Sequence, residues 1–116
     1  MEDWQLDFEW LRIRHFVKDT MHLNQLPDFN QTMVLVGIQE LGQLQEEFTK
    51  DEKECLLHIA TCKLLSKDGY YVFDRVDEDG WPHWKELKTF SGSDEEKEKY
   101  LTQMAIEYFD TIINSN

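Results

Sequence analysis

The chain has few of the residues that mark disordered, secreted or membrane-spanning proteins. Its 116 residues include only 5 glycines, 2 prolines and 2 cysteines. Little glycine and proline with 41% apolar content is typical of one compact domain, which we expect over residues 1–116. Two cysteines without a secretory signal indicate a reducing compartment, so we expect a cytoplasmic protein. No apolar run approaches the roughly 20 residues that cross a bilayer, and membrane insertion is not expected.

Basic residues are also scarce. Lys and Arg total 12 against 24 Asp and Glu, which gives a formal net charge of −12. This charge repels a phosphate backbone and an anionic lipid surface, so we expect neither nucleic acid nor a membrane as a direct partner. Acidity of this kind keeps a protein soluble, and it also steers a basic protein toward the surface. Both interpretations of the charge stay open at this point.

Motifs that specify a reaction are missing too. The chain has no G-x-S-x-G elbow, no Walker lysine and no H-E-x-x-H pair. No glutamate stands three residues before any of the 4 histidines, so the Glu-x-x-His pairs of di-iron bundles are missing. The many carboxylates give no means of choosing an acid/base pair. We therefore expect a protein that is not an enzyme and has no cofactor.

The clearest element is a helix predicted from Thr49 to Leu65. At its start, Thr49 and Glu52 form a capping box, in which each side chain accepts a hydrogen bond from a backbone amide. The apolar residues that follow, both cysteines among them, cover most of the circumference and leave a polar strip through Glu54, His58 and Thr61. A helix this apolar must be surrounded by other elements.

A first helix is predicted from Trp4 to about His22. Four apolar residues recur at helical spacing along it: Leu6, Trp10, Ile13 and Val17. Acidic residues lie near the start of the helix and basic residues near its end, an order that interacts favourably with the helix dipole. Phe8 and Leu11 broaden the apolar stripe, and we assign them to core contacts rather than to a partner surface.

A second helix is predicted from Phe29 to about Phe48, with Asp28 as its N-cap. Gly37 and Gly42 interrupt this helix. They indicate weakness, a close crossing by another helix or a break, and we favour the close crossing.

A last helix is predicted after a second capping box at Ser93 and Glu96. Three acidic residues lie in its first turn, where their negative charges interact favourably with the positive end of the helix dipole. Its apolar side consists of Leu101, Met104, Ala105, Tyr108, Phe109 and Ile112.

Between the third and fourth helices the hydrophobic period becomes alternating, which predicts a β-hairpin. Tyr70 to Val76 forms the first strand, Asp77 to Gly80 the turn, and about Trp81 to Leu87 the return. A two-residue loop would pair Arg75 with Trp84, whereas the four-residue loop pairs Phe73 with Trp84. We favour the four-residue loop because it pairs aromatic rings. The predicted class is mainly α (α+β), a four-helix domain with a β-hairpin inserted between helices 3 and 4.

The hairpin also supplies the leading candidate site. Because neighbouring strand residues point to opposite faces, its aromatic rings cannot all be buried, and an exposed aromatic strip is expected. Tyr and Trp beside charged residues are typical of interaction hot spots. The residues predicted to contact a partner are Tyr70, Tyr71, Arg75, Trp81, His83 and Trp84.

A metal site on the third helix is the alternative, with Glu54, His58 and Cys62 as candidate ligands. Cys55 and Cys62 are about 10.5 Å apart along a helix axis, whereas two sulfurs on one zinc lie within roughly 4 Å. The two thiols therefore cannot share a metal, and we expect both to be buried.

The acidic turn resembles a calcium loop only in part. Asp77, Asp79, Gly80 and Glu86 fall on four positions of the EF-hand pattern, but Arg75 occupies the first ligand position. The hairpin turn explains this acidic run without a metal.

The sequence thus favours a non-enzymatic protein-interaction module with a protein partner, in particular a basic one that it inhibits in the manner of an immunity protein. The alternative function is a small helical protein that binds a metal or ligand at the third helix. Homodimerisation through an edge strand or the first helix is compatible with either role.

Overall fold

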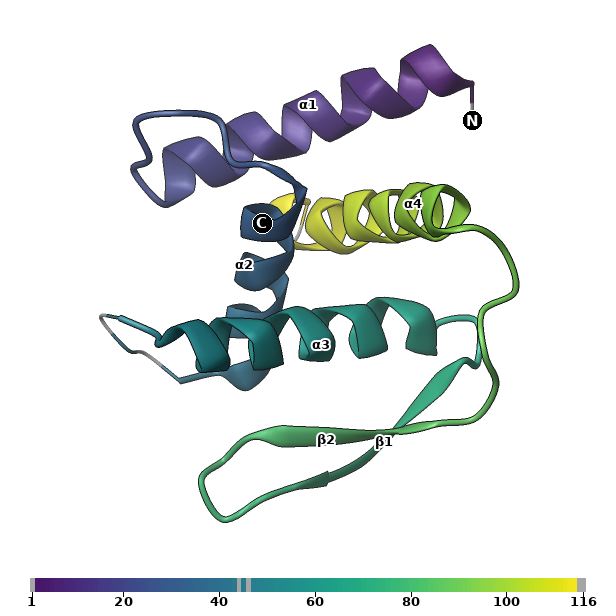
Figure 1. Cartoon of the computed structure of the whole chain (residues 1–116). Helices are drawn as coiled ribbons and strands as arrows, with labels where there is room; N and C mark the ends of the chain where they lie inside the picture. The colour runs from purple at the N-terminus through teal and green to yellow at the C-terminus, as the bar shows by residue number, and fades with distance from the viewer. Residues whose placement is uncertain (1, 44, 46, 115–116) are drawn as a thin grey trace.

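The computed structural model describes residues 2–43, 45 and 47–114 of the chain. It contains four helices and one antiparallel pair of strands, which confirms the predicted fold class. The elements in chain order are α1 (Asp3–Thr20), α2 (Phe29–Leu41), α3 (Lys50–Ser66), β1 (Tyr71–Val76), β2 (Pro82–Glu86) and α4 (Asp94–Ile113). Figure 1 shows α1, α4, α3 and the hairpin stacked from top to bottom, with α2 running crosswise between α1 and α3.

One hydrophobic core joins all four helices, and the hairpin packs beneath α3. The core cluster consists of Leu6, Ile13, Val17, Met33, Val36, Ala60, Leu64, Leu65, Leu101, Ala105, Ile106 and Phe109. Two ion pairs tie the outer helix to its neighbour: Arg12 lies 2.8 Å from Asp110, and Lys99 lies 2.7 Å from Asp3. In the part of the chain that the structure describes, no helix is both long and apolar enough to cross a lipid bilayer.

The assignment of Phe8 and Leu11 to the core is wrong. The side chains of Phe8 and Leu11 are 63% and 40% exposed, and Trp4 is 69% exposed. The physical reason is the position of α1 at the edge of the stack, where it buries Leu6, Ile13 and Val17 on one side only. Its opposite side therefore keeps an apolar stripe in solvent.

The three capping predictions are confirmed. The side chains of Asp28, Thr49 and Ser93 accept hydrogen bonds from the backbone amides three residues later, at 2.8, 3.1 and 3.1 Å. At each start the residue three positions on also bonds back to the cap's amide, which completes a capping box. These local signals fix where α2, α3 and α4 begin.

The two glycines of α2 have different roles. Gly42 adopts a left-handed conformation, with φ +70°, and its amide donates to the Ile38 carbonyl at 3.1 Å. It ends α2 at Leu41, so the predicted extension to Phe48 is wrong; residues 44 and 46 lie outside the described part. Gly37 is a close crossing, as predicted, because a Cβ there would lie 2.8 Å from the carbonyl carbon of Leu56 in α3.

The hairpin register confirms the preferred pairing of Phe73 with Trp84. The turn is one residue longer than predicted, since Val76 pairs with Pro82, and five residues lie between them. An irregularity between Phe73 and Arg75 absorbs the extra residue, because Asp74 has no partner in the register. The aromatic pair is therefore aligned although the turn differs.

Replacing Gly37 by alanine tests the close crossing of α2 and α3. The added methyl group overlaps the Leu56 backbone, which cannot rotate away as a side chain could. We expect Gly37→Ala to lower the free energy of unfolding by about 1–3 kcal/mol, although alanine is the better helix former. Urea unfolding is the measurement, with Gln39→Ala on the exposed side of α2 as the control. Unchanged or increased stability of Gly37→Ala would contradict the close crossing.

Candidate functional site

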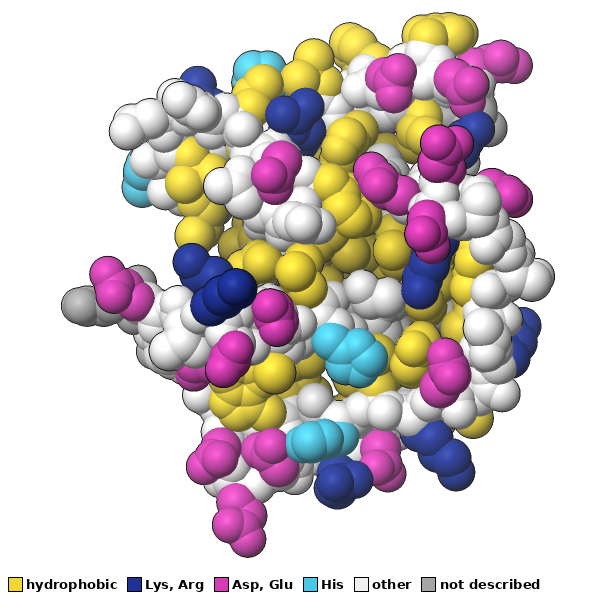
Figure 2. Space-filling view, in the orientation of Figure 1, with side chains coloured by type: hydrophobic (Ala, Val, Ile, Leu, Met, Phe, Trp, Pro, Cys, Tyr) yellow, Lys and Arg dark blue, Asp and Glu magenta, His cyan; other side chains and the backbone are white. Residues whose placement is uncertain are grey.

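A groove of about 540 Å³ lies between the first half of α3 and the hairpin. Figure 2 shows histidine, acidic and hydrophobic side chains gathered on this lower part of the molecule. The groove thus combines residues from both candidate sites of the sequence analysis. Its lining consists of Asp51, Glu54, Cys55, His58 and Ile59 from α3, and Asp77, Trp81, Pro82, His83 and Trp84 from the hairpin.

Asp77 builds the turn that presents Trp81 to the groove. Its Oδ1 accepts hydrogen bonds from the backbone amides of Asp79 at 2.9 Å and Trp81 at 3.0 Å. Its carbonyl accepts from the Gly80 amide at 3.0 Å, and Gly80 takes the positive φ of +86° that closes such a turn. One aspartate therefore satisfies three backbone amides and fixes the chain path around Trp81.

The second carboxylate oxygen of Asp77 holds His83. Its Oδ2 lies 2.8 Å from His83 Nε2. The hydrogen bond from His83, followed by the one from the Trp81 amide, lowers the pKa of the Asp77 carboxyl. Asp77 therefore stays charged at neutral pH, and the groove has a fixed negative group at its hairpin end.

Packing holds Trp84 at the wall of the groove. Its ring meets the Phe73 ring edge to face, with the centroids 5.7 Å apart and the planes at 82°. Among the described residues, the buried indole NH of Trp84 has no hydrogen-bond acceptor. The position of the ring is therefore set by its aromatic contact rather than by a polar one.

On the α3 side, the candidate metal ligands come only partly together. Cys62 Sγ lies 3.5 Å from His58 Nε2, but burial, and secondarily Glu86, raises the pKa of the Cys62 thiol to about 11. A thiol that holds its proton at neutral pH is a poor metal ligand. Across the described ranges, no group of three or more His, Cys, Asp and Glu side chains is placed to hold a metal ion. The described residues thus bring His58 and Cys62 together but supply no third ligand beside them.

Both cysteines were expected to be buried, and this is correct only for Cys62. Cys55 is exposed, because it lies on the side of α3 that faces the groove rather than the core.

The six residues predicted to contact a partner do not form one strip. Trp81, His83 and Trp84 line the groove. Tyr70 instead packs against Phe90, with the ring centroids 5.6 Å apart, and the Lys88 amine lies 4.6 Å from its ring centroid.

The other two predicted residues also lie outside the groove lining. The Tyr71 ring meets His58 edge to face, and its hydroxyl donates to Glu86 at 3.2 Å. Burial raises the pKa of the Tyr71 hydroxyl. Arg75 is exposed and pairs with its neighbour Asp74 at 2.6 Å. The fold therefore splits the predicted set between a partly buried aromatic cluster, the groove and the outer face.

Sequence reasoning missed the α3 residues Asp51, Cys55 and Ile59 in the groove lining. They recur at spacings of four, which together with Glu54 and His58 defines one face of a helix. The helical spacing could be read from the sequence, but this face of α3 lines a groove only because the hairpin lies across from it.

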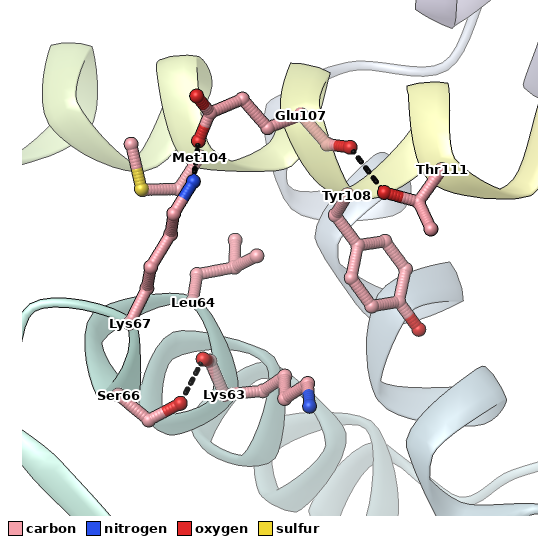
Figure 3. Close-up of a pocket in the computed structure, with 8 residues that line it drawn as sticks. All are labelled: Lys63, Leu64, Ser66, Lys67, Met104, Glu107, Tyr108 and Thr111. Carbon is pink, nitrogen blue, oxygen red and sulfur yellow. Dashed lines mark hydrogen bonds and ion pairs between the residues drawn. The ribbon is translucent and has the colours of Figure 1, made fainter.

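A smaller cavity of about 330 Å³ lies between α3 and α4. Figure 3 shows Lys67 reaching across it to Glu107, at 2.6 Å. On the other side the Tyr108 hydroxyl donates to Glu40 at 2.8 Å, and Lys63 lies 3.8 Å from Glu40. These charged groups already have partners within the fold, so the cavity is a polar link between helices rather than the leading site.

The two thiols should differ in reactivity. Cys55 is exposed in the groove, whereas Cys62 is buried with its thiol pKa raised to about 11. We expect iodoacetamide at neutral pH to alkylate Cys55 alone in the native protein, because the thiolate is the reacting form. Peptide mass spectrometry identifies the site, and alkylation of both thiols in urea is the control. Equal native reactivity would contradict the burial of Cys62.

Replacing Asp77 separates its two functions. Asp77→Asn keeps an oxygen for the Asp79 and Trp81 amides but loses the charge beside His83, whereas Asp77→Ala loses both. We expect the alanine variant to disorder the turn more, as measured by amide hydrogen exchange at residues 77–83.

The same carboxyl predicts a pH dependence. Its pKa is lowered in the folded hairpin, so its contribution to stability is full above the unfolded value of about 4 and is lost as pH falls through the lower folded value. Identical exchange and acid sensitivity in Asp77→Asn, Asp77→Ala and the parent protein would contradict this role.

Comparisons with protein-family models, with curated proteins and with solved structures found no significant match to this chain. No family assignment therefore guides the interpretation of the groove. The function is instead inferred from the chemistry of the groove lining, in which two indole rings and three carboxylates come from two consecutive elements, α3 and the hairpin.

Proposed function

We propose that this chain is a non-enzymatic protein-interaction module that binds a Lys or Arg side chain of a basic partner protein in the groove between α3 and the hairpin. The observation that carries the proposal is the joint placement of Trp81 and Trp84 with the carboxylates of Asp51, Glu54 and Asp77 around one groove. The proposal concerns recognition, and the partner is defined by its chemistry.

The lining of the groove suits a long cationic side chain. Indole faces attract ammonium and guanidinium groups, and the apolar stems of Lys and Arg pack along aromatic and aliphatic surface. Carboxylates accept the hydrogen bonds of the charged end, and these charge-assisted bonds are stronger than neutral ones. In the groove, Trp81, Pro82 and Trp84 supply the apolar wall. The carboxylate acceptors are Asp51 and Glu54 on the α3 side and Asp77 on the hairpin side.

The charge of the whole chain supports the same partner. With a formal net charge of −12, the molecule attracts a basic protein over a longer range than any contact in the groove. Asp77 stays ionised because His83 and the turn amides lower the pKa of its carboxyl. An acidic inhibitor that masks a basic surface on its target would use this combination of steering and local recognition.

The first test uses a blocked tri-arginine peptide as the probe and NMR of the indole NH groups as the readout. We expect the resonances of Trp81 and Trp84 to shift on titration, while those of Trp4 and Trp10 in α1 stay in place. A tri-glutamine peptide of the same length should cause no such shifts. Absence of shifts at Trp81 and Trp84 at physiological salt would contradict the proposal.

Charge variants separate local recognition from the general attraction of an acidic protein. Glu54→Lys places a cation in the groove, whereas Asp19→Lys makes the same change of charge on exposed α1. We expect Glu54→Lys to weaken peptide binding about tenfold or more, since charged contacts at a hot spot contribute at least 1.4 kcal/mol. Equal effects of the two substitutions would show that only the long-range field acts.

A further inference from the structure

The outer side of α1 carries an apolar stripe that the groove does not use. It consists of Trp4, Phe8 and Leu11, and the exposed His15 continues the same face one turn further; 69% of Trp4 and 63% of Phe8 are in solvent. Hydrophobic side chains are visible along the upper edge of the molecule in Figure 2, where α1 lies. The stripe stands directly opposite the buried Leu6, Ile13 and Val17, so the helix is apolar on two sides.

The spacing of this stripe is that of a helix–helix seam. Its residues follow one another at intervals of four, three and four, which is the alternation of a and d positions in a heptad. α1 has 18 residues and is therefore about 27 Å long, enough for two such seams to pack side by side. The stripe is thus shaped for another helix.

The order of charges along α1 indicates which kind of helix would pack on this stripe. Within Asp3–Thr20 there are four acidic and three basic residues, so this helix is nearly neutral although the chain is strongly acidic. The charges are also unevenly placed: Asp3, Asp7 and Glu9 occupy the first half, whereas Arg12, Arg14 and Lys18 occupy the second half with a single acid, Asp19. A basic partner gains little from a neutral helix. Asp3 and Arg12 already pair with Lys99 and Asp110 of α4, and Arg14 donates from Nε to the Pro27 carbonyl at 2.6 Å. An antiparallel copy would therefore bring the acidic and basic halves together mainly through Asp7 and the outer end of Arg14.

We propose that two copies of this chain form a twofold-symmetric dimer through antiparallel pairing of their α1 helices. In this arrangement Phe8 lies beside Leu11 of the second copy, and Trp4 lies beside His15. Asp7, which flanks the stripe, falls next to Arg14 of the second copy. The groove between α3 and the hairpin lies at the other end of the stack from α1, so each dimer presents two grooves (Figure 1).

Sedimentation velocity of the full chain from micromolar to millimolar concentration tests the dimer. A single helix pair buries a small interface, so we expect a reversible, concentration-dependent monomer–dimer equilibrium. Phe8→Glu should weaken it about tenfold or more. Leu87→Glu, at a hairpin site that is 57% exposed, should leave it unchanged. Circular dichroism confirms that both variants are folded.

A charge variant tests the antiparallel order. Asp7→Lys lowers the net negative charge of each copy, which by itself favours association, yet it places a lysine beside Arg14 of the second copy. We expect this variant to weaken the dimer. Glu78→Lys in the hairpin turn makes the same change of charge away from α1 and should leave the dimer unchanged or strengthen it.

Three results would overturn the proposal. One is a protein that stays monomeric at every concentration, which would leave the stripe to another occupant. The second is a dimer that Phe8→Glu does not weaken. The third is a dimer that Asp7→Lys strengthens as Glu78→Lys does. The outcome is independent of the peptide titration, because the groove and α1 are tested by different residues and different readouts.

Discussion

The contact on which the structure depends is the crossing of two backbones at Gly37 and Leu56. With only a hydrogen on its α-carbon, Gly37 lets α2 lie directly on α3. Because α2 packs this closely, α3 is enclosed by α2 and α4, and the hairpin covers part of its remaining surface. The groove exists because the hairpin covers α3 incompletely, so that the first half of the helix faces the turn across open space.

The groove and the cavity between α3 and α4 differ in whether their polar side chains are already paired within the fold. Asp77 uses one carboxylate oxygen to satisfy two turn amides and the other to hold His83, so its charge stays fixed beside Trp81. In the cavity between α3 and α4, by contrast, Lys67 and Tyr108 are tied to Glu107 and Glu40. The groove beside Asp77 therefore leaves an aromatic wall and further carboxylates open to a ligand. In the cavity between α3 and α4, the charged groups are already paired with one another.

Much of the fold could be predicted because its signals are local. The capping boxes at Thr49 and Ser93 need only residues three apart, and the pairing of Phe73 with Trp84 follows from the preference of aromatic rings for each other. The errors arose where a residue's role depends on what lies across from it. Gly42 could be a crossing or a stop, and Phe8 could be core or surface, because no sequence pattern reports which neighbour is present. The same limit divided the site: the hairpin residues and the α3 residues were found separately, and only the fold joins three of the first with two of the second.

The irregularity at Asp74 has a consequence for how this hairpin tolerates changes in length. The turn contains one residue more than the simple four-residue loop, and the bulge contains one residue more than its partner strand, so the two excesses cancel before Phe73 meets Trp84. Deleting Asp74 alone would remove the bulge and leave Phe73 opposite Trp84 in a regular ladder, because Phe73 and Arg75 already pair with the consecutive residues Trp84 and His83. The bulge is thus a position where β1 can lose a residue while Phe73 keeps Trp84 as its partner.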